Sequence, residues 1–284
     1  MSKVRRGALA AGVVLAAAAT VAMPSSAAPA RAKARSSADH PHGPSPALRS
    51  MLREIDAHRI QGDITKLVSF GTRHTLSSQT DPNRGIGAAR DWIFDQLQGY
   101  AAASGGRMTV QKQAFVQPAG PRNPTPVTVT NLVATLRGTQ AESADRVYVV
   151  SGHYDSRCTD VLNSTCDAPG ADDDASGVAA MLELARVMAK RQFDATIVFM
   201  AVAGEEQNLF GSTFFAQQAK AAGMDVEGMF TNDIIGSSTS DKGRRDPFTV
   251  RLFRDARAGG PAPVHRRRER RALAPARALR QGDR

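Results

Sequence analysis

Apolar and polar residues follow one another along this chain with spacings that predict helices and strands in turn. Apolar residues recur at helical spacing over residues 48–68 and 84–97, after Asp174, and over residues 211–222. Apolar runs ended by turn residues predict strands at residues 108–115, 127–136, 147–150, 195–202 and 228–235. This alternation predicts the α/β class: a single three-layer sandwich in which helices flank a mixed, mostly parallel central sheet.

Three clusters of polar residues follow predicted strands between residues 151 and 206. They read SGHYDS, PGADDDASG and AGEEQNLFGS. In an open α/β sheet, ligands bind at the edge where strands end and the next helices begin. His153, the aspartate run that includes Asp173, and the pair Glu205 and Glu206 therefore fall where a site is expected.

Each cluster taken alone has a purely structural explanation. The aspartate run can cap the following helix, the glutamate pair can lie in a solvated loop, and His153 can be a hydrogen-bonded histidine at a strand end. Their combination favours a metal site, because imidazole nitrogen and carboxylate oxygen are ligands that zinc takes. We therefore predict a zinc site at this edge of the sheet.

The motifs GHYDS, PGADDDASG, AGEEQNLFGS and NDIIG together resemble the co-catalytic zinc peptidases typified by bacterial leucyl aminopeptidase. That family also includes glutamate carboxypeptidase II and the transferrin receptor ectodomain, and the resemblance covers residues 49–253. It implies that His153, Asp173 and Asp233 bind one zinc ion. It further implies that Asp173 bridges to a second zinc ion, which Glu206 also binds.

The same resemblance implies roles for Glu205 and Asp155. Two zinc ions about 3.5 to 4 Å apart polarise a peptide carbonyl and acidify a shared water molecule. Glu205 is the implied general base, which takes the proton of that water and passes it to the leaving amine. Asp155 is implied to accept the second ring N–H of His153 and to fix its tautomer. The implied activity is that of a zinc aminopeptidase, which hydrolyses N-terminal residues from peptide substrates.

The first residues of the chain predict export. Lys3, Arg5 and Arg6 precede an apolar run and then small residues, which is the pattern of a cleaved signal peptide over residues 1–28. Residues 29–48 are rich in Ala, Ser, Pro and His, and this composition indicates a linker or a short pro-segment. The apolar run is short for a membrane span. We therefore expect a secreted or periplasmic monomer without a membrane anchor after cleavage.

The sequence contains two cysteines, and both lie in the loop between the His153 and Asp173 motifs. In an exported chain we expect Cys158 and Cys166 to form a disulfide, and zinc–thiolate ligation is the alternative. A disulfide there would restrict the loop that borders the predicted site.

The net charge of +10 is concentrated at the two ends of the chain. Residues 254–284 hold ten arginines against three acidic residues and contribute +7, and the three cations of the predicted signal peptide contribute +3. The residues between them are close to neutral overall. A nucleic-acid partner for the folded domain is therefore not supported.

Residues 254–284 also depart from the family pattern. The resemblance implies a last zinc-binding histidine in a late loop, but His265 is the sole histidine after Asp233 and lies in the unrelated run PAPVHRRRER. A frameshift near Phe253 accounts for such a tail, which we expect to be disordered. The alternative is a genuine basic tail that binds nucleic acid or a membrane surface.

The domain of residues 49–253 is therefore expected to be truncated at its C-terminal end. Without the last histidine, we expect one tight zinc site, an impaired second zinc site and low activity. The missing elements would also expose apolar sheet surface. Three function classes remain open: an exported zinc aminopeptidase, an inactive or poorly folded truncated relative, and a basic-tailed binding protein.

Overall fold

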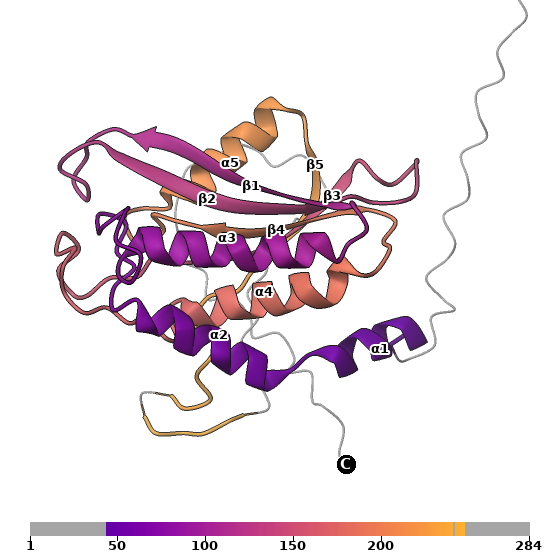
Figure 1. The fold of residues 1–284 in the computed structure, drawn as a ribbon, viewed down its shortest axis with the longest axis horizontal. Coiled ribbons are helices and arrows are strands. Elements are labelled where there is room, and N and C mark those ends of the chain that lie inside the picture. The colour runs from indigo at the N-terminus through magenta and orange to yellow at the C-terminus, as the bar shows by residue number, and fades with distance from the viewer. Residues whose placement is uncertain (1–43, 241, 248–284) are drawn as a thin grey trace, which may run out of the picture. The chain divides into compact units, whose positions relative to one another are not determined.

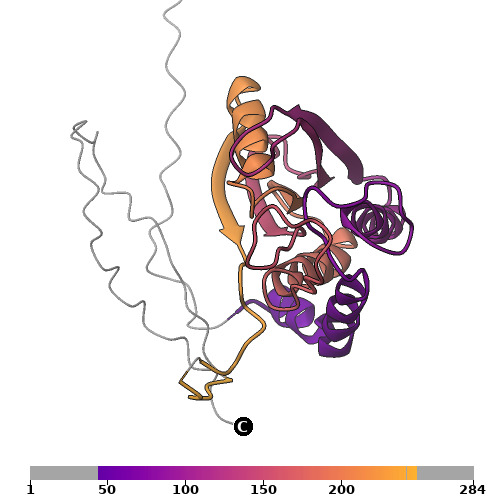
Figure 2. The ribbon, with the colours of Figure 1, turned by 90° about the vertical axis from the view of Figure 1, so that its left-hand side faces the viewer.

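A computed structural model of the chain describes residues 44–240 and 242–247. Within them, five strands form one sheet in the order β1-β2-β4-β3-β5, and helices cover both of its faces (Figures 1 and 2). The predicted signal peptide (residues 1–28), most of the linker (29–48) and the basic tail (254–284) lie outside the described residues. Those three assignments stay predictions.

The helices and strands follow the hydrophobic pattern closely. The strands are β1 (Met108–Gln117), β2 (Val127–Leu136), β3 (Arg146–His153), β4 (Thr196–Val202) and β5 (Asp225–Thr231). The helices are α1 (Pro46–Glu54), α2 (Ala57–Ser69), α3 (Ile86–Ala102), α4 (Ala175–Ala189) and α5 (Phe210–Ala221). None of these described helices is long and apolar enough to cross a membrane.

Helix α1 begins before Arg49, where the sequence placed the start of the domain. The hydroxyl of Ser45 accepts the N–H of Leu48 at 3.2 Å and so caps the first turn. Pro46 is also favourable there, because the first residue of a helix has no use for its own N–H group. Local capping therefore extends the helix into the segment that the sequence assigned to the linker.

The sheet is mixed, and its parallel part lies on one side. β3 pairs in parallel with both β4 and β5, whereas β2 pairs antiparallel with β1 and with β4. The expectation of mostly parallel pairing holds for β4, β3 and β5 and not for β1 and β2. A short connection joins β1 to β2, and such a connection can form an antiparallel hairpin but not a parallel crossover.

The central strand β4 is buried along its whole length and packs against two cores. Phe199 and Ala201 belong to the core beneath α2, α3 and α4, while Val198 and Met200 belong to a second core with Phe215 of α5. Figures 1 and 2 show α5 on one face of the sheet and the other three helices on the opposite face. These are the three layers expected from the sequence, and a strand covered on both faces is apolar throughout.

Helix α4 starts at the edge of the sheet where β3 ends. The carboxylate of Asp174 accepts the N–H of Gly177 at 2.8 Å and the N–H of His153 at 3.0 Å. It therefore caps the helix and ties its first turn to the end of β3. The close approach needs glycine, since a Cβ on Gly152 would lie 2.7 Å from the carbonyl carbon of Gly177.

Candidate metal centre

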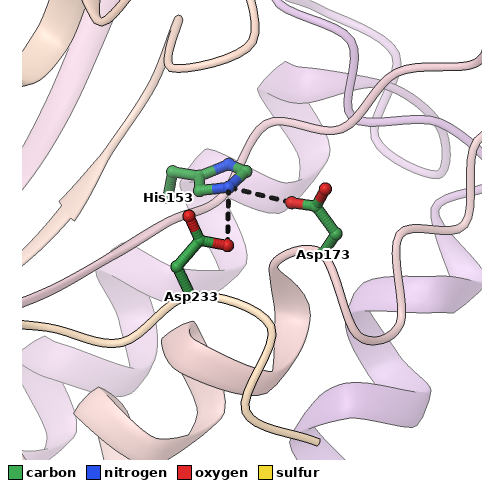
Figure 3. Close-up of side chains that lie close together, drawn as sticks. All are labelled: His153, Asp173 and Asp233. Carbon is green, nitrogen blue, oxygen red and sulfur yellow. Dashed lines mark ion pairs between the residues drawn. The ribbon is translucent and has the colours of Figure 1, made fainter. Parts of the chain in front are cut away.

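His153, Asp173 and Asp233 meet at this edge of the sheet (Figure 3). The Nε2 atom of His153 lies 3.0 Å from Oδ1 of Asp173 and 4.0 Å from Oδ1 of Asp233. One ligand atom from each residue lies within 4.8 Å of the other two. The three residues come from the end of β3, the loop before α4 and the segment after β5. The structure thus brings together the three residues predicted to hold the first zinc ion.

The imidazole of His153 is fixed on its far side by Asp155. Its Nδ1 atom lies 3.1 Å from the main-chain oxygen of Asp155 and 3.5 Å from the carboxylate oxygen Oδ1 of the same residue. Because both acceptors face Nδ1, that nitrogen carries the ring proton and Nε2 points toward Asp173 and Asp233. The sequence expected the carboxylate to be the acceptor, whereas the nearer acceptor is the carbonyl oxygen.

His153 lies in a strongly negative environment. Burial alone lowers its pKa, but Asp155 and Asp173 outweigh that effect and raise the pKa of His153 to about 12. In return, the hydrogen bond from His153 lowers the pKa of Asp173. The surroundings therefore favour a positive charge at Nε2. A metal ion bound by these side chains would displace the proton from that nitrogen.

The carboxylate of Asp155, which is fully buried, also holds the turn that follows β4. Its Oδ1 atom accepts the N–H of Glu205 at 3.2 Å, and its Oδ2 atom accepts the N–H of Glu206 at 3.1 Å and the hydroxyl of Thr75 at 3.2 Å. Asp155 therefore orients the two glutamates as well as His153. The sequence indicated only its contact with His153.

The two adjacent glutamates point to different partners. Oε2 of Glu205 lies 3.9 Å from Nε2 of His153, whereas Oε2 of Glu206 lies 2.6 Å from Nε of Arg157. Burial raises the pKa of both carboxyl groups, and Arg157 acts against that rise at Glu206. Within residues 44–240 and 242–247, His153, Asp173 and Asp233 form the sole group of three or more potential metal ligands, and Glu206 is not part of it.

The aspartate run has three different functions in the structure. Asp172 accepts the N–H of Gly236 at 2.8 Å, Asp173 contacts His153, and Asp174 caps α4. The helix-capping and metal-binding interpretations of this run therefore apply to different members of it.

Asp233 lies in a loop rather than on a strand. The sequence placed it within a strand at residues 228–235, but β5 ends at Thr231, where it pairs with Ser151 of β3. The chain then bends toward α4, and the N–H of Ile235 donates to the hydroxyl of Ser176 at 3.1 Å. This bend, together with the bond from Gly236 to Asp172, brings the Asp233 carboxylate to the site.

Arg73 and His74 support the site, and the sequence analysis missed both. Arg73 is fully buried and donates to the main-chain oxygens of Tyr154, Pro169 and Gly170 at 2.7, 2.6 and 2.9 Å. Burial lowers the pKa of Arg73 to about 10, while Asp155 and Asp174 act in the opposite direction. The available signal was an arginine and a histidine shortly after a predicted helix, and a solvated loop gives the same signal.

The loop beside the site is closed by the predicted disulfide between Cys158 and Cys166. His74 contacts the middle of this loop. Its Nδ1 atom accepts the N–H of Leu76 at 3.0 Å, so the ring proton is on Nε2. Nε2 donates that proton to the main-chain oxygen of Val161 at 3.0 Å. Burial lowers the pKa of His74, which fits a neutral ring in that position. The loop is thus held at its ends and at its middle.

Comparison with known proteins gives a family for this sequence. A sequence model of peptidase family M28 matches residues 131–263. A protein of Pyricularia oryzae named "Probable zinc metalloprotease" is 59% identical over 215 residues, which are 76% of this chain and 42% of that protein. The chain therefore spans less than half the length of this curated relative.

Solved structures share the fold. LapB from Legionella pneumophila matches with a TM-score of 0.54 and 22% identity, over 71% of this chain and 50% of that chain. A glutaminyl cyclase from Porphyromonas gingivalis matches with a TM-score of 0.51 and 23% identity, over 66% of this chain and 62% of that chain. At such identities the likeness shows the fold alone, because one fold can carry different activities.

Proposed function

This chain belongs to peptidase family M28, and on that premise we propose that it is an exported zinc metallopeptidase that removes N-terminal residues from peptides. The observation that carries the proposal is the meeting of His153, Asp173 and Asp233 within 4.8 Å of one another. One imidazole nitrogen and two carboxylate oxygens suit zinc, and three protein ligands leave a coordination position open, as in catalytic zinc sites.

The chain's own residues would hold the ion through Nε2 of His153 and one carboxylate oxygen each of Asp173 and Asp233. Zinc bound there supplies a Lewis acid for a peptide carbonyl and a water of lowered pKa. Asp155 keeps the other ring nitrogen protonated, and Asp174 holds the main chain of His153 in place. Such supporting hydrogen bonds fix the orientation of a metal ligand before the ion arrives.

Glu205 is the residue suited to carry the proton. Its carboxylate lies 3.9 Å from Nε2 of His153, and burial raises its pKa. A carboxylate with a raised pKa can accept a proton from water and return it to the leaving amine. Asp155 holds the turn through two peptide N–H groups, so Glu205 is already in position.

The test is to measure zinc content and leucine anilide hydrolysis for the full chain and two variants. Asp233→Asn removes a proposed ligand, and Asp225→Asn is the matched control, because Asp225 is exposed at the start of β5. We expect the wild type and Asp225→Asn to retain zinc after dialysis and to hydrolyse the substrate. Asp233→Asn should lose both properties, and zinc retention equal to the wild type would contradict the proposal.

The aminopeptidase specificity and the export rest on different support. The motif resemblance supports the first, and the leader pattern together with the disulfide between Cys158 and Cys166 supports the second. An aminopeptidase requires a free α-amine, so it should cleave leucine anilide and spare the N-acetylated form. Equal hydrolysis of the two substrates would contradict aminopeptidase specificity while leaving zinc peptidase activity in place.

A further inference from the structure

Glu206 is already paired with a cation that belongs to the chain. Nε of Arg157 lies 2.6 Å from Oε2 of Glu206, and the two side chains are 34% and 11% exposed. Nη1 of Arg157 donates to the main-chain oxygen of Cys158 at 3.2 Å. The disulfide to Cys166 closes the loop that begins at Cys158, so the guanidinium lies between the start of this closed loop and Glu206.

Arg157 contacts one of the two carboxylates that a second metal ion would share. It forms the hydrogen bond to Glu206 directly. Among the ion pairs of residues 44–240 and 242–247, Arg157 is the cation that contacts the Glu206 carboxylate. The first group of ligands depends on the contacts of His153 with Asp173 and Asp233.

Resting on the proposed function, we propose that Arg157 is a built-in counter-ion that competes with a second zinc ion for Glu206 and so keeps this chain a single-zinc enzyme. A metal ion can reach Oε2 of Glu206 only if the charge-assisted bond from Arg157 breaks. That competition weakens the second site without touching His153, Asp173 or Asp233. We expect it to lower the affinity for a second zinc ion by at least about tenfold.

Arg122 provides a matched control. Its Nη1 atom donates at 2.7 Å to the main-chain oxygen of Glu206, so it carries the same charge to the same residue but leaves the carboxylate free. Arg122→Gln and Arg157→Gln therefore remove equal charge from the same turn. Only the second variant should free the carboxylate for a metal ion.

The experiment measures zinc bound per full-length chain by equilibrium dialysis against a series of buffered free zinc concentrations. All variants should bind the first zinc ion as the wild type does. Arg157→Gln should bind a second zinc ion at least about tenfold more tightly than the wild type, while Arg122→Gln and Arg157→Lys should match the wild type. Adding Glu206→Gln to Arg157→Gln should abolish the gain, because the freed ligand is then missing.

The other outcomes of the dialysis would overturn the inference. A second-site affinity that Arg157→Gln leaves unchanged, or that Arg122→Gln raises equally, would overturn the inference while the first zinc ion still supports the proposed function. Two tight zinc ions in the wild type would overturn it as well. A wild type that binds no zinc would overturn the proposed function and this inference together. Should Arg157→Gln fold poorly, Arg157→Met removes the same charge and takes its place in the same dialysis, and a second-site affinity equal to that of the wild type would contradict the competition.

Discussion

Replacement of Asp155 by asparagine should loosen the turn that carries Glu205 and Glu206. The buried carboxylate accepts the N–H groups of Glu205 and Glu206, one on each oxygen, and the hydroxyl of Thr75. Asparagine offers a single side-chain acceptor oxygen, so its NH₂ group would face one of the two peptide N–H groups. One buried donor is then left without an acceptor.

The size of the effect follows from these contacts. An unsatisfied buried donor costs about 1 to 3 kcal/mol, and the remaining bonds lose the charge that makes them about twice as strong as neutral ones. We therefore expect Asp155→Asn to lower the free energy of unfolding by about 3 kcal/mol. Thr75→Val is the matched control, because it removes one donor to the same carboxylate and should cost about 1 kcal/mol.

Urea unfolding of the zinc-free proteins at neutral pH measures both values. Zinc affinity should also fall by about 10- to 100-fold in Asp155→Asn, because the residue orients His153. A free energy of unfolding within about 0.5 kcal/mol of the wild type, the range of ordinary surface substitutions, would refute the view that Asp155 organises the site.

Glu205→Gln should lower kcat by about 10²- to 10⁴-fold, because it removes the group that carries the proton. Its zinc content should equal that of the wild type, and a loss of zinc in elemental analysis would contradict this role. Burial raises the pKa of Asp63 from 3.8 to about 6. The folded state therefore keeps a proton that the unfolded chain releases, so the contribution of Asp63 to stability should be lost as the pH rises across that interval. In urea unfolding, Asp63→Asn should make the fall in stability between those pH values smaller than in the wild type, and an unchanged fall would contradict the raised pKa. Phe230 is 60% exposed on the edge strand β5 and should promote self-association. Phe230→Lys should lower the average mass in sedimentation at high protein concentration, and an unchanged mass would exclude this surface.

The sequence alone predicted the elements and the place of the site, because both depend on local patterns. Strand β4 reads as a continuous apolar run, and β3 ends in a polar cluster at the sheet edge, so His153 could be placed there. The three aspartates were harder to separate. Asp172, Asp173 and Asp174 are neighbours in sequence, and only the cap that Asp174 makes with Gly177 follows a local pattern. The partners of Asp172 and Asp173 are Gly236 and His153, which lie far away in sequence and are not encoded locally.

Two further features of the site, the positions of Asp233 and Glu206, also depend on tertiary contacts that the sequence pattern does not encode. Asp233 follows an apolar run that reads as a strand, but pairing of β5 with β3 ends at Thr231, and the chain turns to the start of α4. The binding of a second zinc ion by Glu206 stays a prediction, and in the structure its carboxylate pairs with Arg157, beside the disulfide loop. In both cases a contact made by a distant loop decides where the carboxylate points.

Zinc held by His153, Asp173 and Asp233 is what should make this chain a peptidase. The most direct test is leucine anilide hydrolysis by the chelator-treated full chain as zinc is added back. We predict that chelation abolishes turnover, and that turnover returns and saturates at about one zinc ion per chain. Turnover that survives chelation, or zinc that binds and restores no hydrolysis, would contradict the assignment.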